Sequence, residues 1–229
     1  MASSGTYSFN PAIADVVLNA YGRLGIRRTD ILAEHLVDAA NEANLALVMF
    51  SNRQPNLWTS ELVTQSLTSS VATYTLNARV IMILAAYISI TVGSSTVDRI
   101  ITPLSTTEYA ALPNKDQSAP PTQYWFNRQS TPQVTLWPVP DSATTYTLKM
   151  QCVRQLQDAS IPSGVTLDLP YRWLDAFTAE LSARLAKRYK PELEDKRKLD
   201  AAEAYAIAAM QDQENVPLYV RPMFDAYYR

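Results

Sequence analysis

The sequence is poor in the residues that most enzymes need at an active site. Its 229 residues include one histidine, His35, and one cysteine, Cys152. A single cysteine excludes a disulfide within the chain, and a histidine without further ligands at suitable spacing does not make a metal site. The five glycines form neither a GxGxxG nor a GxxxxGK phosphate loop, and GxSxG is also absent. We therefore expect no enzymatic activity, no cofactor and no bound metal.

An excess of charge of one sign is missing too. The 20 basic residues are balanced by 22 acidic ones, which leaves a net charge of -2. Proteins that hold nucleic acid by its phosphates normally carry a basic excess, so we expect no stable nucleic-acid binding.

Long hydrophobic runs are also lacking. The longest, Val80 to Ile90, is too short to cross a membrane, and residues 1–10 lack the basic start and apolar core of a secretion signal. We expect a soluble protein that is made in the cytoplasm and has no membrane partner.

What the sequence does contain is enough apolar material for one full core or two small ones. Apolar residues make up 47% of the chain and charged residues 18%, which is typical of an ordered globular protein. Cys152 is expected to be a buried thiol, and His35 is expected at the edge of a helical core.

Both ends of the chain show helical periodicity. Asn10 and Pro11 predict a helix start, and Thr29 is expected to cap a longer helix that runs to about Asn52. These two helices are predicted to form an antiparallel hairpin. Near the other end, a helix is expected up to Lys190 and a second from Pro191 to about residue 213. The apolar stripe of the first of these consists of Leu174, Phe177, Leu181 and Leu185.

The middle of the chain alternates with a period of two, which predicts strands. About six strands are expected in an antiparallel sheet or small barrel, at 62–67, 71–76, 80–92, from 124, and in a hairpin of 133–137 with 146–152, and 99–103 is a candidate for one more. In the hairpin, Pro138 and Pro140 cannot continue the ladder because they lack an N–H donor. A single helical turn is expected at 106–112.

Together these elements predict an α+β fold: a four-helix bundle with a β-module inserted between its halves. The expected divisions are residues 1–56 for the first half of the bundle, 57–160 for the β-module, 161–213 for the second half and 214–229 for an extended C-terminal arm.

Three segments are candidates for binding. The first is a group of basic residues near residue 190. It can face an acidic partner or DNA, or its members can form ion pairs within the chain. The pattern favours internal ion pairs. The members of the group are Arg184, Lys187, Arg188, Lys190, Lys196, Arg197 and Lys198. The second is QYWFNR at 123–128, whose aromatics can stack on single-stranded nucleic acid but are also typical of an ordinary strand, the interpretation that we favour.

The third candidate is the C-terminal arm, in which Pro217 and Pro222 prevent a regular helix. Exposed apolar clusters usually mark an interaction surface, and tyrosine and arginine are enriched at interfaces. Either the arm folds back on its own bundle or it docks on another chain, and we favour docking. The predicted partner-binding residues are Leu218, Tyr219, Val220, Arg221, Met223, Phe224, Tyr227, Tyr228 and Arg229.

Several phrases resemble one family. The order of QVTLWPVPD, a second strand, and DLPYRW leading into a helix is similar to the head-to-tail adaptors of short-tailed phages, also called tail tubular protein A or head completion proteins. NPAIADVVLNAYGRLGI and ATYTLNARVIMILAAYI extend the resemblance over most of residues 8–210.

The resemblance implies a structural virion protein at the head-tail interface. Such an adaptor forms a ring, in this family a dodecamer, that joins the portal protein to the tail nozzle or tube and can contact tail fibres. DNA passes through the ring without specific binding. Alternatives that remain open are a non-catalytic binding module, an accessory hydrolase with a ligand-binding β-domain, and a different connector, such as a stopper.

Overall fold

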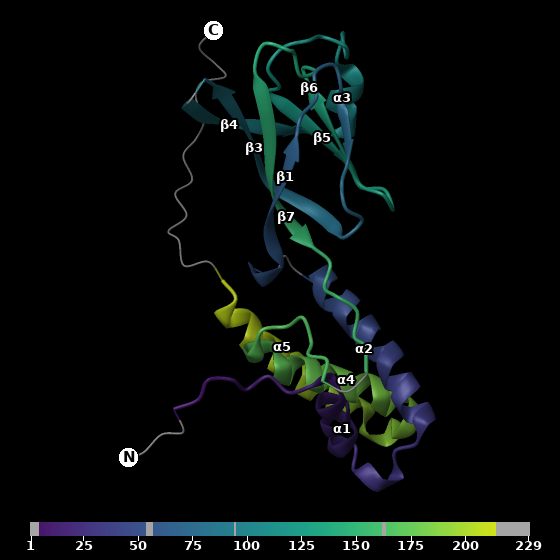
Figure 1. Cartoon of the computed structure of the whole chain (residues 1–229). Coiled ribbons are helices and arrows are strands. Elements are labelled where there is room, and N and C mark those ends of the chain that lie inside the picture. The colour runs from purple at the N-terminus through teal and green to yellow at the C-terminus, as the bar shows by residue number, and fades with distance from the viewer. Residues whose placement is uncertain (1–4, 54–56, 94, 162–163, 214–229) are drawn as a thin grey trace.

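The computed structural model describes residues 5–53, 57–93, 95–161 and 164–213, which form a helical part and a curled β-sheet (Figure 1). Within these residues there are five α-helices and one seven-stranded sheet. The mixed α+β class is therefore confirmed.

The N-terminal helices are α1 (Ile13–Arg23) and α2 (Ala33–Arg53). Neither starts where the capping signals predicted. Ala12 occupies the cap position of α1 and bridges Thr166 as extended backbone, so Asn10 and Pro11 lie outside the helix. Residues 28–30 form a short 3-10 turn, and Thr29 does not cap α2. At α1, the pairing of Ala12 with Thr166 overrides the capping signal of Asn10 and Pro11. At α2, the turn of residues 28–30 takes up Thr29, the residue that was expected to cap the helix.

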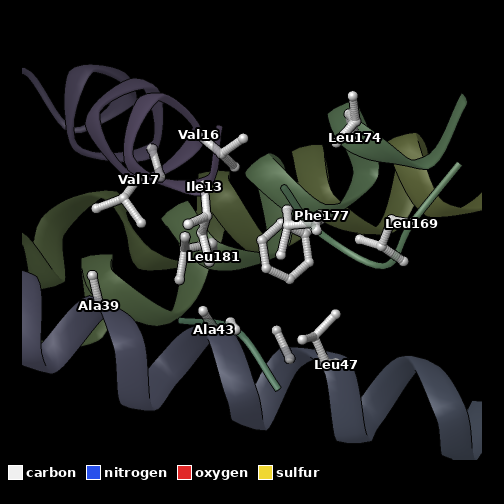
Figure 2. Packing of buried hydrophobic residues seen from close by; sticks show 14 of the residues in the cluster. Ile13, Val16, Val17, Ala39, Ala43, Leu47, Leu169, Leu174, Phe177 and Leu181 are labelled. Atoms are coloured by element: carbon white, nitrogen blue, oxygen red, sulfur yellow. The ribbon is translucent and has the colours of Figure 1, made fainter. Parts of the chain in front are cut away.

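The C-terminal helices are α4 (Leu174–Tyr189) and α5 (Glu194–Gln211). All four residues of the predicted α4 stripe are buried. Helix α4 packs against α1, α2 and α5, whereas α1 and α2 make their main contacts with α4 and not with each other as the predicted hairpin requires. Figure 2 shows side chains from α1, α2 and α4 meeting around Phe177 and Leu181. Helix α4 is thus the centre of the helical core.

Small residues set the distance between α4 and α5. Ala179 and Ala183 of α4 pack against Ala201 of α5, and all three are buried. The alanine-rich stretch of α5 permits the close approach that its composition predicted.

The sheet consists of seven strands in the order β1-β7-β3-β4-β5-β6-β2. Their bounds are β1 Ser60–Ser66, β2 Thr73–Thr75, β3 Val80–Val92, β4 Ser95–Leu104, β5 Gln123–Asn127, β6 Gln133–Trp137 and β7 Thr145–Arg154. Strands β4 and β5 pair in parallel, which differs from the expected antiparallel sheet. A parallel pair needs a crossover connection, and residues 105–122 supply it with helix α3 (Thr106–Ala111), which begins at a capping box of Ser105 and Glu108.

The predicted hairpin of β6 and β7 is wrong. Strand β6 pairs with β5 and β2, while β7 pairs with β1 and β3. The connection between them is held elsewhere: Val139 exchanges backbone hydrogen bonds with residues 117 and 119, and Trp137 Nε1 donates to the carbonyl of Asn114. The two strands present their apolar faces to the same core, as their alternation predicted, without being neighbours.

The buried face of β7 confirms the expectation for Cys152. Tyr146, Leu148, Met150 and Cys152 are all buried in the core of the sheet. Burial raises the pKa of the Cys152 thiol to about 11, and the nearby charge of Glu61 adds to the effect.

Two buried or half-buried ion pairs lie where the helices meet the sheet. Arg172 donates to the fully buried carboxylate of Asp212 at 2.7 Å, and the same carboxylate accepts the N–H of Leu57 at 3.2 Å. Arg154, the last residue of β7, pairs with Asp168 in the segment that leads into α4. These pairs join the end of α5, the start of the sheet and the return to the helices.

Candidate interaction surfaces

The predicted partner-binding residues, from Leu218 to Arg229, lie outside the described residues. Their role, including whether the arm folds back or docks on another chain, stays a prediction. The candidate surfaces below therefore belong to residues 5–213.

Most of the basic side chains at the end of α4 and the start of α5 form ion pairs with acidic side chains of the same chain. Five of the seven form such pairs: Arg184 with Glu180 and Glu42, Arg188 with Asp38, Lys190 with Glu192, Arg197 with Asp200, and Lys198 with Glu194. The pair of Glu194 and Lys198 forms at 2.6 Å, and Glu192 pairs with Lys190 at 3.8 Å. This arrangement fits the internal ion-pair interpretation better than a surface for DNA.

A charged groove of about 550 Å³ runs between α2, α4 and α5. Its walls include Glu42, Leu45 and Arg53 of α2 and Lys198 and Ala202 of α5. The guanidinium of Arg53 lies 4.3 Å from the ring centre of Tyr205 of α5 in a cation–π contact.

His35 has a structural role at the start of α2. Its Nδ1 accepts the backbone N–H of Leu32 at 3.0 Å, which caps the helix end that Thr29 was expected to cap. The imidazole stacks on Tyr189 with ring centres 4.9 Å apart and meets the edge of Tyr21 at 5.7 Å. Burial raises the pKa of both tyrosines, so they remain neutral phenols, and Tyr189 donates to Asp38. His35 therefore lies at the edge of the helical core, as expected.

A second hollow, of about 780 Å³, lies beside α1 and the start of α4. Arg27 and Arg28 are exposed at its rim, and Arg23 is held by Asp175 at 2.5 Å. Phe9 of the N-terminal segment also lines it and is 76% exposed. The described lining contains no histidine or cysteine, so the hollow can hold an anionic or apolar group but offers little for catalysis.

The aromatic strand at 123–127 is an ordinary part of the sheet. Tyr124 is buried, and Phe126 packs against the same core. Trp125 points to the other side, where its ring stacks on Tyr109 of α3 at 4.8 Å and its Nε1 donates to Thr106. Helix α3 therefore covers the aromatic ring that was a candidate for stacking on a base.

The described residues contain neither a metal-ligand cluster nor a helix suited to span a membrane. Among them, no group of three or more His, Cys, Asp or Glu side chains could hold a metal ion. None of their helices combines the length and the apolar character that a membrane span needs.

Apolar side chains on the outer sides of α2 and α5 were not identified from the sequence. They are Val37, Leu45 and Val48 on α2, and Leu199, Ile207 and Met210 on α5, each between 45% and 72% exposed. In the sequence, these residues form a second apolar row on each helix, outside the row that faces the core. A prediction that assigns a single buried row to each helix does not identify them.

Comparison with known proteins gives one family. The family model described as SU10 adaptor protein matches residues 12–221. Among solved structures, a chain described as the neck of an empty GTA particle computed with C6 symmetry is 12% identical, with 92% of this chain and 95% of that chain covered. Its TM-score of 0.31 is too low to support an argument from that likeness. No curated protein matches the sequence.

Proposed function

Because this chain belongs to the SU10 adaptor family, we propose that it is a structural protein of a phage particle that joins the portal to the tail. Several copies form a ring, of the dodecameric kind, below the portal protein and above the tail nozzle or tube, with tail fibres as further candidate partners. The protein acts by assembly and not by catalysis, at the head-tail interface of a virion whose parts are made in the host cytoplasm.

The observation that carries this proposal is the extent of the family match. Residues 12–221 include both pairs of helices and all seven strands. The family match therefore covers the sequence of every helix and strand that the structure describes.

In this proposal the parts of the chain have separate tasks. The helices of residues 1–56 and 161–213 form one four-helix unit beside the DNA channel, and residues 57–160 form the β-module that faces tail components. Residues 214–229 reach the portal. A net charge of -2 suits a channel wall, because fixed positive charge would hold the phosphates of passing DNA.

Electron microscopy of the full chain mixed with the portal protein of the same phage tests the proposal. The expected result is a ring of this protein that is coaxial with the portal ring. A chain that stays monomeric by native mass spectrometry, and that does not join the portal at any ratio, would contradict the adaptor role and favour a separate binding module.

The role of the C-terminal arm has its own test. Deleting residues 214–229 is expected to leave the helices and the sheet folded and to abolish attachment to the portal. A variant of full length, L218S/F224S/Y228S, replaces three large side chains of the arm with serine, and E214S/N215S/D225S is its polar control. Normal portal affinity of the apolar variant would show that the arm assignment is wrong.

A further inference from the structure

The outer side of α2 carries three exposed apolar side chains. Val37, Leu45 and Val48 are 61%, 53% and 45% exposed. Asn41 is the exposed polar residue between them, and Glu34 lies one turn before Val37. We call the apolar trio the α2 stripe. Val37 and Val48 lie opposite the buried side of α2, which faces α4, and Leu45 lies at the groove that α2 shares with α4 and α5.

The outer side of α5 carries a similar row. Leu199, Ile207 and Met210 are 72%, 59% and 72% exposed and form the α5 stripe. Glu203 is exposed within the row, and Lys196 lies one turn before Leu199. The buried side of α5, with Ala201 and Ala208, faces α4.

The two stripes have the same spacing. Val37, Leu45 and Val48 are separated by eight and three residues, and so are Leu199, Ile207 and Met210. At 1.5 Å per residue, each stripe is ~16 Å long. Two helices with side chains at i, i+8 and i+11 can therefore interlock along their whole apolar length.

The polar residues agree with one relative direction of the two helices. When the stripes are aligned in parallel, Val37 lies beside Leu199, Leu45 beside Ile207 and Val48 beside Met210. The same alignment places Glu34 opposite Lys196 and the amide of Asn41 opposite the carboxylate of Glu203. An antiparallel alignment would put Glu34 and Lys196 at opposite ends, because each lies near the N-terminus of its helix.

A single copy does not bring its own stripes together, because Leu45 lies at the groove that α2 shares with α4 and α5, whereas Ile207 lies at a separate hollow beside Arg23 and Asp175. We propose that the α2 stripe of one copy packs in parallel against the α5 stripe of the next copy. Two different surfaces that meet in this way make a heterologous contact, which forms a ring when the rotation closes. This inference rests on the proposed ring and identifies the surfaces that build it.

Each contact is small, since three apolar side chains per face cover much less than the area of a standard protein–protein interface. One contact alone is therefore weak. Many contacts stabilise one another when the copies form a closed ring or are gathered on a portal. The full chain on its own is expected to associate weakly at low concentration.

Disulfide trapping tests the register directly. Two single variants, Leu45→Cys and Ile207→Cys, are mixed and oxidised with copper phenanthroline, first as free protein at high concentration and then bound to portal rings. We expect a mixed dimer to form from the two variants. The native Cys152 does not interfere, because it is buried in the core of the sheet.

Three controls keep the result specific. Each variant oxidised alone should give little dimer, and the mixture of Leu45→Cys with Leu199→Cys, which shifts the register by eight residues or ~12 Å, should give about tenfold less. Equal trapping at the shifted position would overturn the proposed register.

The charged ends of the stripes provide a second measurement. Glu34→Lys or Lys196→Glu alone should lower the rate of disulfide trapping by about two- to fivefold, the range of one exposed pair. The combination of the two variants should restore most of it. If the combination lowers the trapping rate as much as the two single effects together, the parallel arrangement is contradicted.

The outcomes separate this interface from the proposed function. Rings on the portal without trapping at 45 and 207 would overturn the interface and leave the adaptor role intact. Trapping without portal binding would support the interface and contradict the adaptor role. If Ile207→Asp instead lowers the melting temperature of the monomer, the chain's own arm covers the α5 stripe, and the proposed contact is wrong.

Discussion

Arg172 donates a hydrogen bond of 2.7 Å to the carboxylate of Asp212, a residue 40 positions later whose side chain is fully buried. The carboxylate also accepts the backbone N–H of Leu57, so one side chain joins the turn before α4, the end of α5 and the entry to the sheet. One buried acid thus joins three segments at the junction between helices and sheet, in addition to the pair of Arg154 and Asp168.

Replacing this acid should loosen the junction. Asp212→Ala removes both hydrogen bonds, but Arg172 is about one third exposed and can recover part of its hydration. We expect the free energy of unfolding to fall by about 2 kcal/mol, measured by urea denaturation. Glu192→Ala breaks the exposed pair with Lys190 and serves as the control, with an expected loss below about 1 kcal/mol. Equal losses in the two variants would contradict the special role of Asp212.

The helical core should be sensitive to loss of volume at its centre. Phe177 is fully buried and meets the ring of Phe50 with centres 6.2 Å apart. Phe177→Ala should lower the free energy of unfolding by about 3 to 5 kcal/mol, since the cavity cannot fully collapse. Tyr171→Ala, at a site 73% exposed, should change it little. Thermal unfolding followed by circular dichroism measures both, and a loss below 1 kcal/mol at Phe177 would contradict the central position of α4.

The pair of Arg154 and Asp168 should make stability depend on pH. Burial alone would raise the pKa of Asp168, but the hydrogen bonds from Arg154 and from the N–H of Gln157, with the charge of Arg154, lower it. A carboxyl whose folded pKa is depressed contributes stability that is present above its unfolded pKa, about 3.9, and is lost as the pH falls through the folded value.

Urea denaturation between pH 7 and pH 2 checks this sign. The wild type should lose more stability than Asp168→Asn on going below about pH 4, because the variant has no proton to take up at this position. Parallel curves for the two proteins would show that the pair does not contribute. Asp158→Asn is the matched control on the adjoining loop.

Cys152 should be inert to thiol reagents in the folded protein. A pKa of about 11 leaves roughly a hundredfold less thiolate at pH 8 than an ordinary thiol has, since each unit changes the fraction tenfold. Burial in the sheet core slows access further. Labelling with a chromogenic disulfide should be complete within minutes in denaturant and take hours without it. Rapid labelling of the native chain would mean that the sheet opens locally.

Patterns that depend on neighbours in sequence were predictable. The bounds of β3 followed from its apolar run, and the buried stripe of α4 followed from helical periodicity, because burial of one face repeats along that helix. The resemblance to head-to-tail adaptors is confirmed by the family match.

Pairings between distant segments were not predictable in the same way. Alternation in β6 and β7 gave the correct buried faces but not the partners, since a strand's face does not specify which strand lies beside it. The cap of α2 by His35 was missed because the side chain reaches back from inside the helix. Arg172 and Asp212 lie 40 positions apart, so no local pattern links them, and only the fold brings the guanidinium to the buried carboxylate.

The central position of α4 also has a consequence for synthesis on the ribosome. Helices α1 and α2 leave the ribosome first, but the helix that covers their apolar sides ends only at Tyr189. At ~5–20 residues per second, the wait is on the order of ten seconds. Strand β7, which pairs with β1 and β3, is complete earlier, at Arg154. The nascent chain therefore closes its sheet while α1 and α2 still expose apolar residues, which is the interval in which a chaperone would bind it.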